Sequence, residues 1–417
     1  MKRVRMLAIV PALLALTISS AHASYIGRVV DASTGKPVPG AVVTLGDRAQ
    51  RTSADGTFQF EGMAGHSISF RAAGFKRLDL PAVELHGIHA EIPMTPFNVK
   101  GLYLSAYGIG SSILRNHALQ IIEQNHLNAL VIDVKGDRGL IPFKVDLPLA
   151  AEIGAQKVIT VKDMKGLLSE LKLKGIYLIA RIVVFKDDLL AAARPQWAVK
   201  TKGGHPFRDR EKLRWVDPFR REVWDYNISV ARAAAEVGFD EVQFDYVRFP
   251  DNRGLVFSQP ATEDSRTQAI TGFLKAAHEA LTPHNIMVAA DIFGYVLWNT
   301  NDTDIGQKIE PIMEAVDVAS PMLYPSGYQF GIPNYRNPVN HPYEIIYLSL
   351  KRAQERSKAP TTRFRPWIQA FRDYAFGGKV FAEDELRVQI KAAEDFGASG
   401  FLIWNPRNVY PKNGFHN

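Results

Sequence analysis

The sequence predicts an α/β chain in which a (β/α)8 TIM barrel follows a small all-β, Ig-like sandwich. From about residue 97 onward, apolar runs alternate with amphipathic helical stretches, a pattern typical of βα units on a parallel sheet. Eight such runs can be counted, which is the number of strands in a closed barrel. The 417 residues, 46% hydrophobic and 22% charged, suffice for two domains and favour a globular fold over disorder.

The first 23 residues predict an export signal. Three basic residues precede an apolar run over residues 6–18, and Ala21-His22-Ala23 supplies a small-residue cleavage site. A membrane anchor is the alternative, but it needs about 20 apolar residues and this run is shorter. We therefore expect a mature chain that begins at Ser24, has no membrane span and is exported, either periplasmic or secreted.

Charge and cysteine content narrow the function classes. The formal net charge is +7, and three of these charges lie in the expected signal. Such a weak excess does not indicate a nucleic-acid partner. The chain contains no cysteine, which excludes disulfides, thiolate nucleophiles and cysteine metal sites.

Residues 24–96 predict the β-sandwich, because short alternating runs are broken by Gly- and Pro-rich turns. Pro93 and Pro96 mark its end, and residues 97–417 are assigned to the barrel. Three runs within this segment, residues 27–31, 35–43 and 52–58, have a distinctive sequence pattern. In these runs the segment closely resembles the carboxypeptidase regulatory-like domain, which implies an accessory Ig-like module.

The barrel region contains eight candidate strands, at residues 99–107, 129–135, 175–184, 240–248, 287–295, 316–324, 365–371 and 400–405. The clearest helical stretches between them are residues 113–124, 164–174, 218–237, 263–281 and 383–396. Few residues follow the eighth strand, so the usual last helix is missing or is supplied by another element. An open doubly wound sheet is the alternative, but no Gly-x-Gly-x-x-Gly stands between a strand and a helix.

Acidic residues mark several strand ends, where a parallel barrel builds its active site. Asp245 and Asp291 lie near the ends of the fourth and fifth strands, among apolar neighbours. Two carboxyl groups about 5 to 9 Å apart can cleave an acetal, because one protonates the leaving oxygen while the other attacks or activates water. We expect Asp245 to be the nucleophile or base and Asp291 the general acid. For Asp133 and Asp137, a loop cap or an arginine partner is an equally good interpretation.

Other strand ends carry groups that suit a carbohydrate. Aromatic rings stack on sugar faces, and amide and guanidinium groups bond hydroxyls. The expected substrate-binding residues are Asp133, Arg181, Arg248, Tyr324, Gln369 and Trp404. Trp404, like Trp367, could equally pack in the core.

Metal and serine chemistry are less well supported. No histidine falls at a predicted strand end, and neither His-Glu-x-x-His nor Gly-x-Ser-x-Gly is present. An acidic trio of Asp133, Asp245 and Asp291 could hold Ca²⁺ or Mg²⁺, but we expect neither a metal nor a cofactor.

Residues 99–408 contain several distinctive runs, namely 101–105, 131–135, 180–187, 215–218, 239–250 and 320–325. In these runs the segment resembles the bacterial glycosidase-type TIM barrels of uncharacterised activity. The resemblance implies a glycoside hydrolase fold and supplies no established substrate. We expect a glycosidase acting on an extracytoplasmic polysaccharide or its oligosaccharides. A non-catalytic polysaccharide-binding protein on the same scaffold is the alternative.

Residues 238–247 are also similar to the strand-four signature of family 18 chitinases. The similarity breaks at Val247, where those enzymes carry the glutamic acid that protonates the leaving group, and at Gln243, where they carry an aspartate. Valine cannot transfer a proton. We therefore expect no chitinase activity.

Overall fold

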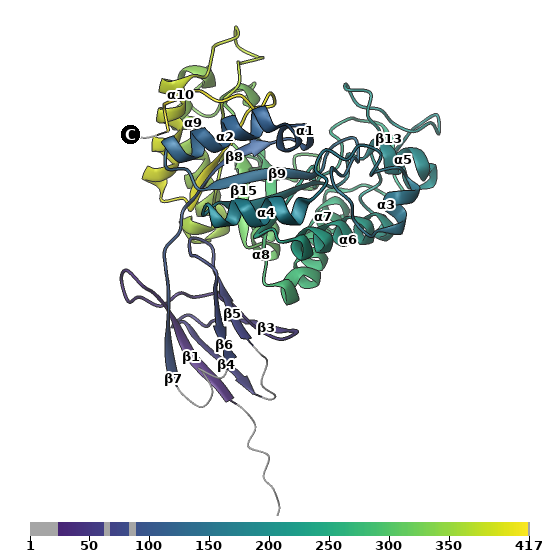
Figure 1. The fold of residues 1–417 in the computed structure, drawn as a ribbon. Coiled ribbons are helices and arrows are strands. Elements are labelled where there is room, and N and C mark those ends of the chain that lie inside the picture. The colour runs from purple at the N-terminus through teal and green to yellow at the C-terminus, as the bar shows by residue number, and fades with distance from the viewer. Residues whose placement is uncertain (1–23, 62–66, 83–88, 416–417) are drawn as a thin grey trace, which may run out of the picture.

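The structure, a computed structural model, describes residues 24–61, 67–82 and 89–415. The expected export signal, residues 1–23, lies outside the described residues. A narrow β domain stands below a wider domain of strands surrounded by helices (Figure 1). In the described part of the chain, no helix is both long and apolar enough to cross a membrane.

The N-terminal domain is the expected Ig-like sandwich of two sheets. One sheet has the order β4-β1-β7 and the other β3-β2-β5-β6, and most pairs are antiparallel. The strands are β1 (Ser24–Asp31), β2 (Val42–Leu45), β3 (Arg48–Arg51), β4 (Thr57–Glu61), β5 (Ser67–Arg71), β6 (Leu78–Pro81) and β7 (His89–Met94). β4 alternates exposed and buried residues, so that Phe58 and Phe60 face a core shared with Val29, Val43 and Phe70.

The second domain is a closed parallel barrel, as the eight apolar runs predict. The strand order around it is β10-β12-β14-β15-β16-β17-β8-β9. The strands are β8 (Val99–Leu104), β9 (Ala129–Lys135), β10 (Tyr177–Val183), β12 (Glu241–Asp245), β14 (Met287–Phe293), β15 (Val318–Met322), β16 (Trp367–Gln369) and β17 (Gly400–Trp404). Each lies within its predicted range, and the prediction of a TIM barrel is confirmed.

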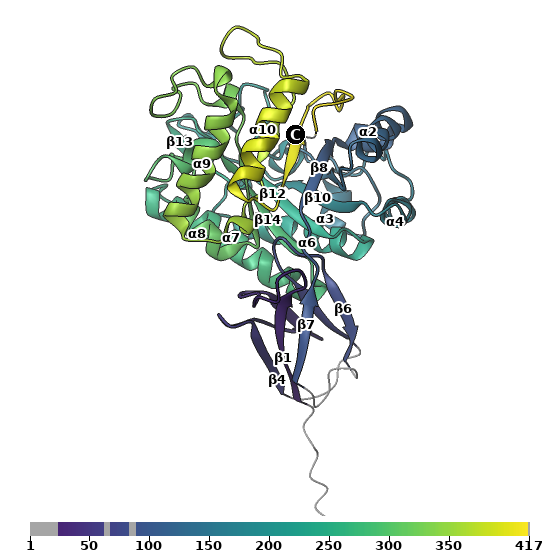
Figure 2. The same cartoon turned by 90° about the vertical axis from the view of Figure 1, so that its left-hand side faces the viewer.

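Helices surround the barrel and separate its apolar outer face from water (Figure 2). They are α1 (Ala106–Gly110), α2 (Ser112–Gln124), α3 (Pro148–Glu152), α4 (Met164–Leu173), α5 (Asp188–Ala193), α6 (Arg221–Val237), α7 (Glu263–Leu281), α8 (Ile309–Ala315), α9 (Pro342–Ser357) and α10 (Glu383–Phe396). Thr262 caps the start of α7, and Gly238 ends α6 at φ +117°. Two short strands outside the barrel, β11 (Lys200–Thr201) before α6 and β13 (Leu255–Val256) between α6 and α7, pair in antiparallel fashion.

The chain after β17 takes the place of the usual last helix. Among the described residues up to 415, no helix follows Trp404. Instead, the Tyr410 hydroxyl donates a hydrogen bond to the Tyr103 carbonyl at 2.6 Å. Asn408 accepts from Ser105 at 2.8 Å and donates to the same Tyr103 carbonyl. This C-terminal segment therefore covers β8 and the start of α1.

The sandwich docks on the N-terminal end of the barrel, away from the strand ends that carry the expected site. Asp317, just before β15, lies 3.6 Å from Arg71 Nε and 3.4 Å from Arg51 Nη2. Arg71 also donates to Asn285 at 2.9 Å. Burial opposes ionisation of Asp317, but Arg71 and then His278 and Arg51 lower the pKa of this carboxyl well below its usual range. The two domains are thus joined by a buried ionic contact.

Candidate active site

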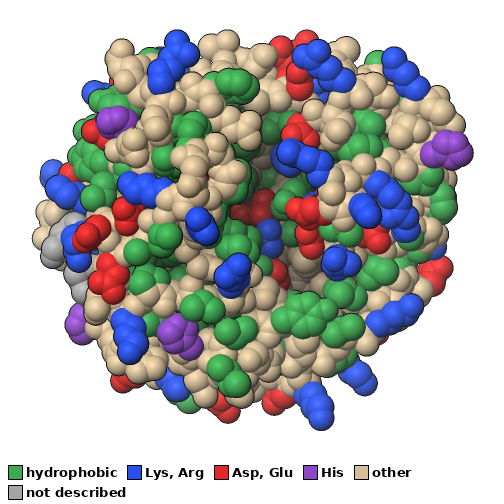
Figure 3. Space-filling view, turned by 90° about the horizontal axis from the view of Figure 1, so that it is seen from above, with side chains coloured by type: hydrophobic (Ala, Val, Ile, Leu, Met, Phe, Trp, Pro, Cys, Tyr) green, Lys and Arg blue, Asp and Glu red, His purple; other side chains and the backbone are tan. Residues whose placement is uncertain are grey.

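A cavity of about 180 Å³ opens at the C-terminal ends of the barrel strands. It is lined by Arg181, Asp245, Tyr246, Arg248, Asp291, Phe293, Met322, Tyr324, Trp367 and Trp404. Seen from the side opposite the sandwich, the surface is hollowed, with acidic atoms in its depth and cationic side chains around it (Figure 3). A larger cavity of about 260 Å³ lies at the other end of the barrel, beside Arg71 and Phe97. No pair of carboxyl groups lines it, and parallel barrels carry their active sites at the opposite, C-terminal ends of the strands.

Asp245 ends β12, and its carboxylate is fixed by three donors. Arg181 donates from Nε at 2.9 Å and from Nη2 at 2.5 Å, both to Oδ2. The backbone N–H of Tyr246 donates to Oδ1 at 2.6 Å. Tyr246 has φ +46°, a left-handed conformation that is unusual for a residue with a side chain and is concentrated at functional sites. This turn ends the strand and leaves Asp245 at the wall of the cavity.

Asp291 lies on the neighbouring strand, β14, and is 1% exposed. The Trp367 indole donates to its Oδ1 at 2.7 Å. Burial and then the negative charge of Asp245 raise the pKa of Asp291 well above its usual range, against opposing effects of Arg181 and Trp367. Phe244 pairs with Ala290 across the two strands. Asp245 and Asp291 each follow one of these residues, so they lie opposite one another on neighbouring strands.

Arg181 connects the cavity to a second carboxylate beneath it. Its Nη1 donates to Asp133 Oδ1 at 2.6 Å, and the Tyr103 hydroxyl donates to Oδ2 at 2.6 Å. Tyr103 stacks on Trp404 with ring centroids 3.9 Å apart, and the Arg181 guanidinium lies 4.9 Å from the Trp404 ring. Burial raises the pKa of Asp133, while Arg181 and the Tyr103 hydroxyl oppose this shift. Asp133 therefore supports Arg181 and does not line the cavity.

Four of the six expected substrate-binding residues line the cavity, namely Arg181, Arg248, Tyr324 and Trp404. Gln369 does not. Its Oε1 accepts from the Ser326 N–H, and its Nε2 donates to the Ser326 hydroxyl and to the Phe371 carbonyl. The amide is fully used inside the protein and holds the loop after β15. Asp137 is 40% exposed and lies 3.6 Å from Lys186, outside the cavity wall.

Gln307 was not indicated by the sequence, yet it joins the ends of the two strands that carry Asp245 and Asp291. Its Nε2 donates to the carbonyls of Val247 and Asp291 at 3.2 Å each, and its Oε1 accepts from Phe293 N at 3.0 Å. It precedes α8 in a loop, and a single glutamine in a loop carries no recognisable pattern. Val247 itself is buried and is not among the residues that line the cavity.

The acidic residues at the strand ends do not form a metal cluster. Over residues 24–61, 67–82 and 89–415, no group of three or more His, Cys, Asp or Glu side chains could hold a metal ion. In the trio that the sequence suggested, the Arg181 guanidinium lies between Asp133 and Asp245 and bonds both.

The comparison with protein families agrees with this geometry. Residues 101–410 match the family described as "Putative glycosyl hydrolase domain". The chain belongs to this family. Residues 26–91 match the carboxypeptidase regulatory-like domain. Both resemblances expected from the sequence are confirmed, and the barrel is of the glycosidase type. No curated protein matches the chain.

Two solved structures share the fold at low sequence identity. The glycoside hydrolase domain of PgaB (BpsB) from Bordetella bronchiseptica aligns with a TM-score of 0.50 and 15% identity, over 75% of this chain and 94% of that one. The beta-galactosidase of the psychrophilic Marinomonas ef1 aligns with a TM-score of 0.54 and 13% identity, over 74% and 54%. A hypothetical protein from Ruminiclostridium thermocellum is 35% identical over 46% of this chain and 96% of its own, with a TM-score of 0.41.

Proposed function

We propose that this protein hydrolyses glycosidic bonds of an extracytoplasmic polysaccharide, with Asp245 as the nucleophile and Asp291 as the general acid. The observation that carries the proposal is the unequal environment of two carboxyl groups in one cavity. Both are buried, but Asp245 receives two guanidinium N–H groups, whereas Asp291 receives one neutral indole N–H. Such a difference separates an acid from a base.

The raised pKa of Asp291 keeps this carboxyl protonated at a pH where an ordinary aspartate is ionised. A protonated carboxyl can donate its proton to the glycosidic oxygen as the bond to the anomeric carbon breaks. Arg181 balances the negative charge of Asp245 and orients it. It acts through Asp245, because three of the five N–H groups of a guanidinium are here committed to Asp245 and Asp133.

The level positions of Asp245 and Asp291 favour a retaining reaction. Neighbouring strands lie about 4.8 Å apart, and retaining enzymes hold their two carboxyl groups about 5 to 5.5 Å apart. In the first step Asp245 would attack the anomeric carbon while Asp291 protonates the leaving oxygen. In the second step ionised Asp291 would take a proton from water, whose oxygen then displaces Asp245.

Tyr324 and Trp404 supply the aromatic surface on which a sugar ring would stack. The alternative function, a non-catalytic polysaccharide-binding protein, would not need an uncompensated acid. Across the described residues, no Lys, Arg or His lies within ion-pair distance of Asp291, and this favours the enzyme. Export from the cytoplasm, expected from residues 1–23, remains part of the proposal.

The test compares the wild type with Asp291→Asn and Asp245→Asn on a panel of neutral and acidic polysaccharides, by release of reducing ends. Asp251→Asn is the matched control, because Asp251 is exposed and does not line the cavity. We expect the control to keep activity and both site variants to lose it. Activity that survives in both site variants would refute the assignment. Proton NMR of the first product anomer distinguishes retention from inversion.

A further inference from the structure

Arg248 lines the cavity beside the two catalytic candidates and has few partners within the protein. Its Nη1 donates to the Phe249 carbonyl at 3.0 Å, and its guanidinium lies 4.9 Å from the Trp215 ring and 5.3 Å from the Tyr246 ring. Asp245 takes its hydrogen bonds from Arg181 and Tyr246. In the part of the chain that the structure describes, no carboxylate lies within ion-pair distance of Arg248. A guanidinium has five N–H donors, so most of those on Arg248 remain available.

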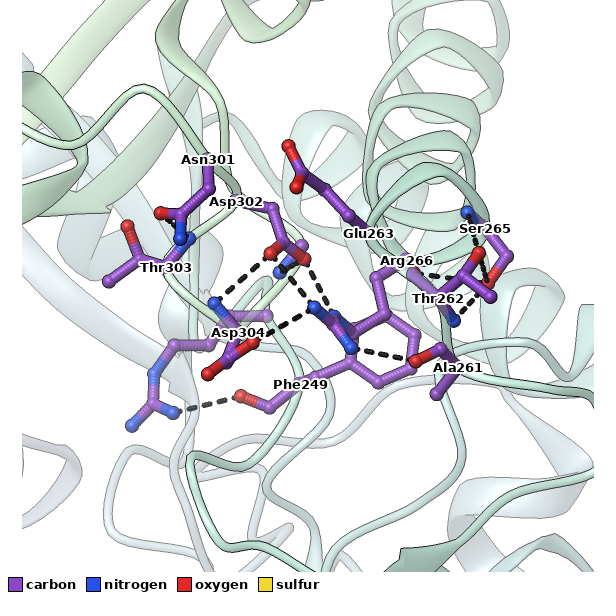
Figure 4. A network of polar contacts seen from close by, with 12 residues as sticks. Phe249, Ala261, Thr262, Glu263, Ser265, Arg266, Asn301, Asp302, Thr303 and Asp304 are labelled. Atoms are coloured by element: carbon purple, nitrogen blue, oxygen red, sulfur yellow. Dashed lines mark hydrogen bonds and ion pairs between the residues drawn. The ribbon is translucent and has the colours of Figure 1, made fainter.

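The backbone next to Arg248 is hydrogen-bonded to the loop that precedes α8. Phe249 N donates to the Ile305 carbonyl at 2.8 Å. The loop around Ile305 is fixed by Asp302, which receives two hydrogen bonds from Arg266 at 2.6 and 2.8 Å (Figure 4). Arg266 also donates to the Ala261 carbonyl at 2.7 Å. Stacking and this network together fix the guanidinium before any ligand arrives.

Residues 200–214, here called the basic loop, add positive charge near the cavity. The loop contains six Lys or Arg residues against two acids, Asp209 and Glu211. Both acids pair with Lys186, at 3.1 and 2.7 Å. Two of the six basic residues, Arg208 and Arg214, lie 3.7 and 3.6 Å from Asp188, so the excess of positive charge rests on the other four. The loop leads directly into Trp215, on which Arg248 packs.

One residue of the basic loop, Arg210, lies close enough to Tyr374 for its charge to act on the Tyr374 hydroxyl. Burial and Asp373 raise the pKa of Tyr374, and the positive charge of Arg210 lowers it. Tyr374 stacks on Phe371, which in turn contacts Tyr324 of the cavity wall. These three rings therefore connect the wall of the cavity to the surroundings of Arg210.

We propose that Arg248 binds an anionic group on the sugar in the cavity, so that the substrate is an acidic polysaccharide. This proposal rests on the proposed function of the same cavity. A planar carboxylate, as in a uronic acid, fits a guanidinium through two parallel hydrogen bonds. A sulfate ester offers similar acceptors and is the second source of such a group. The basic loop would attract either polymer by its charge.

Binding is measured in the Asp291→Asn background, which separates recognition from cleavage. Calorimetric titrations use oligomers of galacturonate, glucuronate and mannuronate, the same oligomers after reduction of their carboxyl groups, and sulfated galactan oligomers. We expect at least one acidic oligomer to bind about tenfold or more tightly than its reduced form, as one charge-assisted contact allows. Arg248→Gln should remove this preference and Arg248→Lys should restore part of it. Arg253→Gln, which changes an exposed cation in the same connection between β12 and β13, should leave it unchanged.

The sulfated oligomers show which anionic group the site recognises. If the protein binds them more tightly than every carboxylate oligomer, the group is a sulfate ester and not a uronic acid carboxylate. Equal binding of acidic and reduced oligomers, or no binding of any acidic oligomer, would overturn the proposal. Cleavage by the wild type is assayed separately on the same set. Binding that depends on Arg248 without cleavage would refute the hydrolase alone. Cleavage of neutral oligomers that Arg248→Gln does not slow would refute the anionic site alone.

Discussion

Trp367 donates its indole N–H to Asp291 at 2.7 Å, across the interior of the barrel from β16 to β14. Trp367 is 1% exposed, so this donor cannot be replaced easily by water. A hydrogen bond to the ionised form of a carboxyl lowers its pKa, whereas burial and Asp245 raise it. Trp367 therefore limits how far the pKa of the candidate acid rises.

Trp367→Phe should shift the pH profile of the enzyme upward. The indole N–H lowers the pKa of Asp291, whereas burial and the charge of Asp245 raise it. Without the indole N–H, the pKa of Asp291 therefore rises further. Because the protonated form is the active acid, kcat/KM should fall at a higher pH in the variant than in the wild type. Trp224→Phe is the matched control, because it also removes a buried indole N–H, which donates to the Pro218 carbonyl outside the cavity, and it should leave the pH profile unchanged. A downward shift in Trp367→Phe would contradict the acid role of Asp291.

Asp291→Asn should slow cleavage of natural glycosidic bonds by roughly 10²- to 10⁴-fold, the contribution typical of a general acid. Aryl glycosides with good leaving groups need less protonation and should be partly spared. The decline of kcat/KM as pH rises through the raised pKa of Asp291 should also disappear. Steady-state kinetics on a leaving-group series measures both effects. Equal loss on every leaving group would argue for another acid.

Asp245→Ala should abolish turnover, and added azide should restore part of it by attacking the anomeric carbon in place of the carboxylate. The fold should persist, because Arg181 keeps its hydrogen bond to Asp133. The glycosyl azide product, identified by NMR, reports the face of attack. If formate or azide never rescues the variant while its thermal unfolding is normal, Asp245 acts as a base in an inverting reaction.

The sequence could predict the barrel because eight buried parallel strands leave eight apolar runs, and each of these runs contains its observed strand. It could also place Asp245 and Asp291 on one face by the two-residue period of a strand. It offered an arginine partner for Asp133 but could not predict that this partner is Arg181, or that Gln369 faces Ser326. Which polar group pairs with which depends on register between strands and on loop paths, and neither leaves a local pattern.

The contact between the two domains gives a prediction on stability. Asp317 is 5% exposed and Arg71 2% exposed, so Asp317→Asn leaves buried cations without their carboxylate. Removing one partner of a buried pair costs about 3–5 kcal/mol. Asp79→Asn, which removes an exposed partner of Arg77, should cost about 0–1 kcal/mol. Thermal and denaturant unfolding measure the difference.

The same contact predicts weaker folding in acid. The folded-state pKa of Asp317 lies below that of an unfolded aspartate, which is about 3.9. Its contribution to stability is therefore fully present above roughly pH 4 and is lost as pH falls through the folded-state pKa. Asp317→Asn should flatten the acid limb of unfolding temperature against pH, while Asp79→Asn should not. Cleavage of small substrates at neutral pH should survive in both variants, because Asp317 lies at the opposite end of the barrel from Asp245. An unchanged acid limb in Asp317→Asn would show that the sandwich is not held to the barrel by this charge.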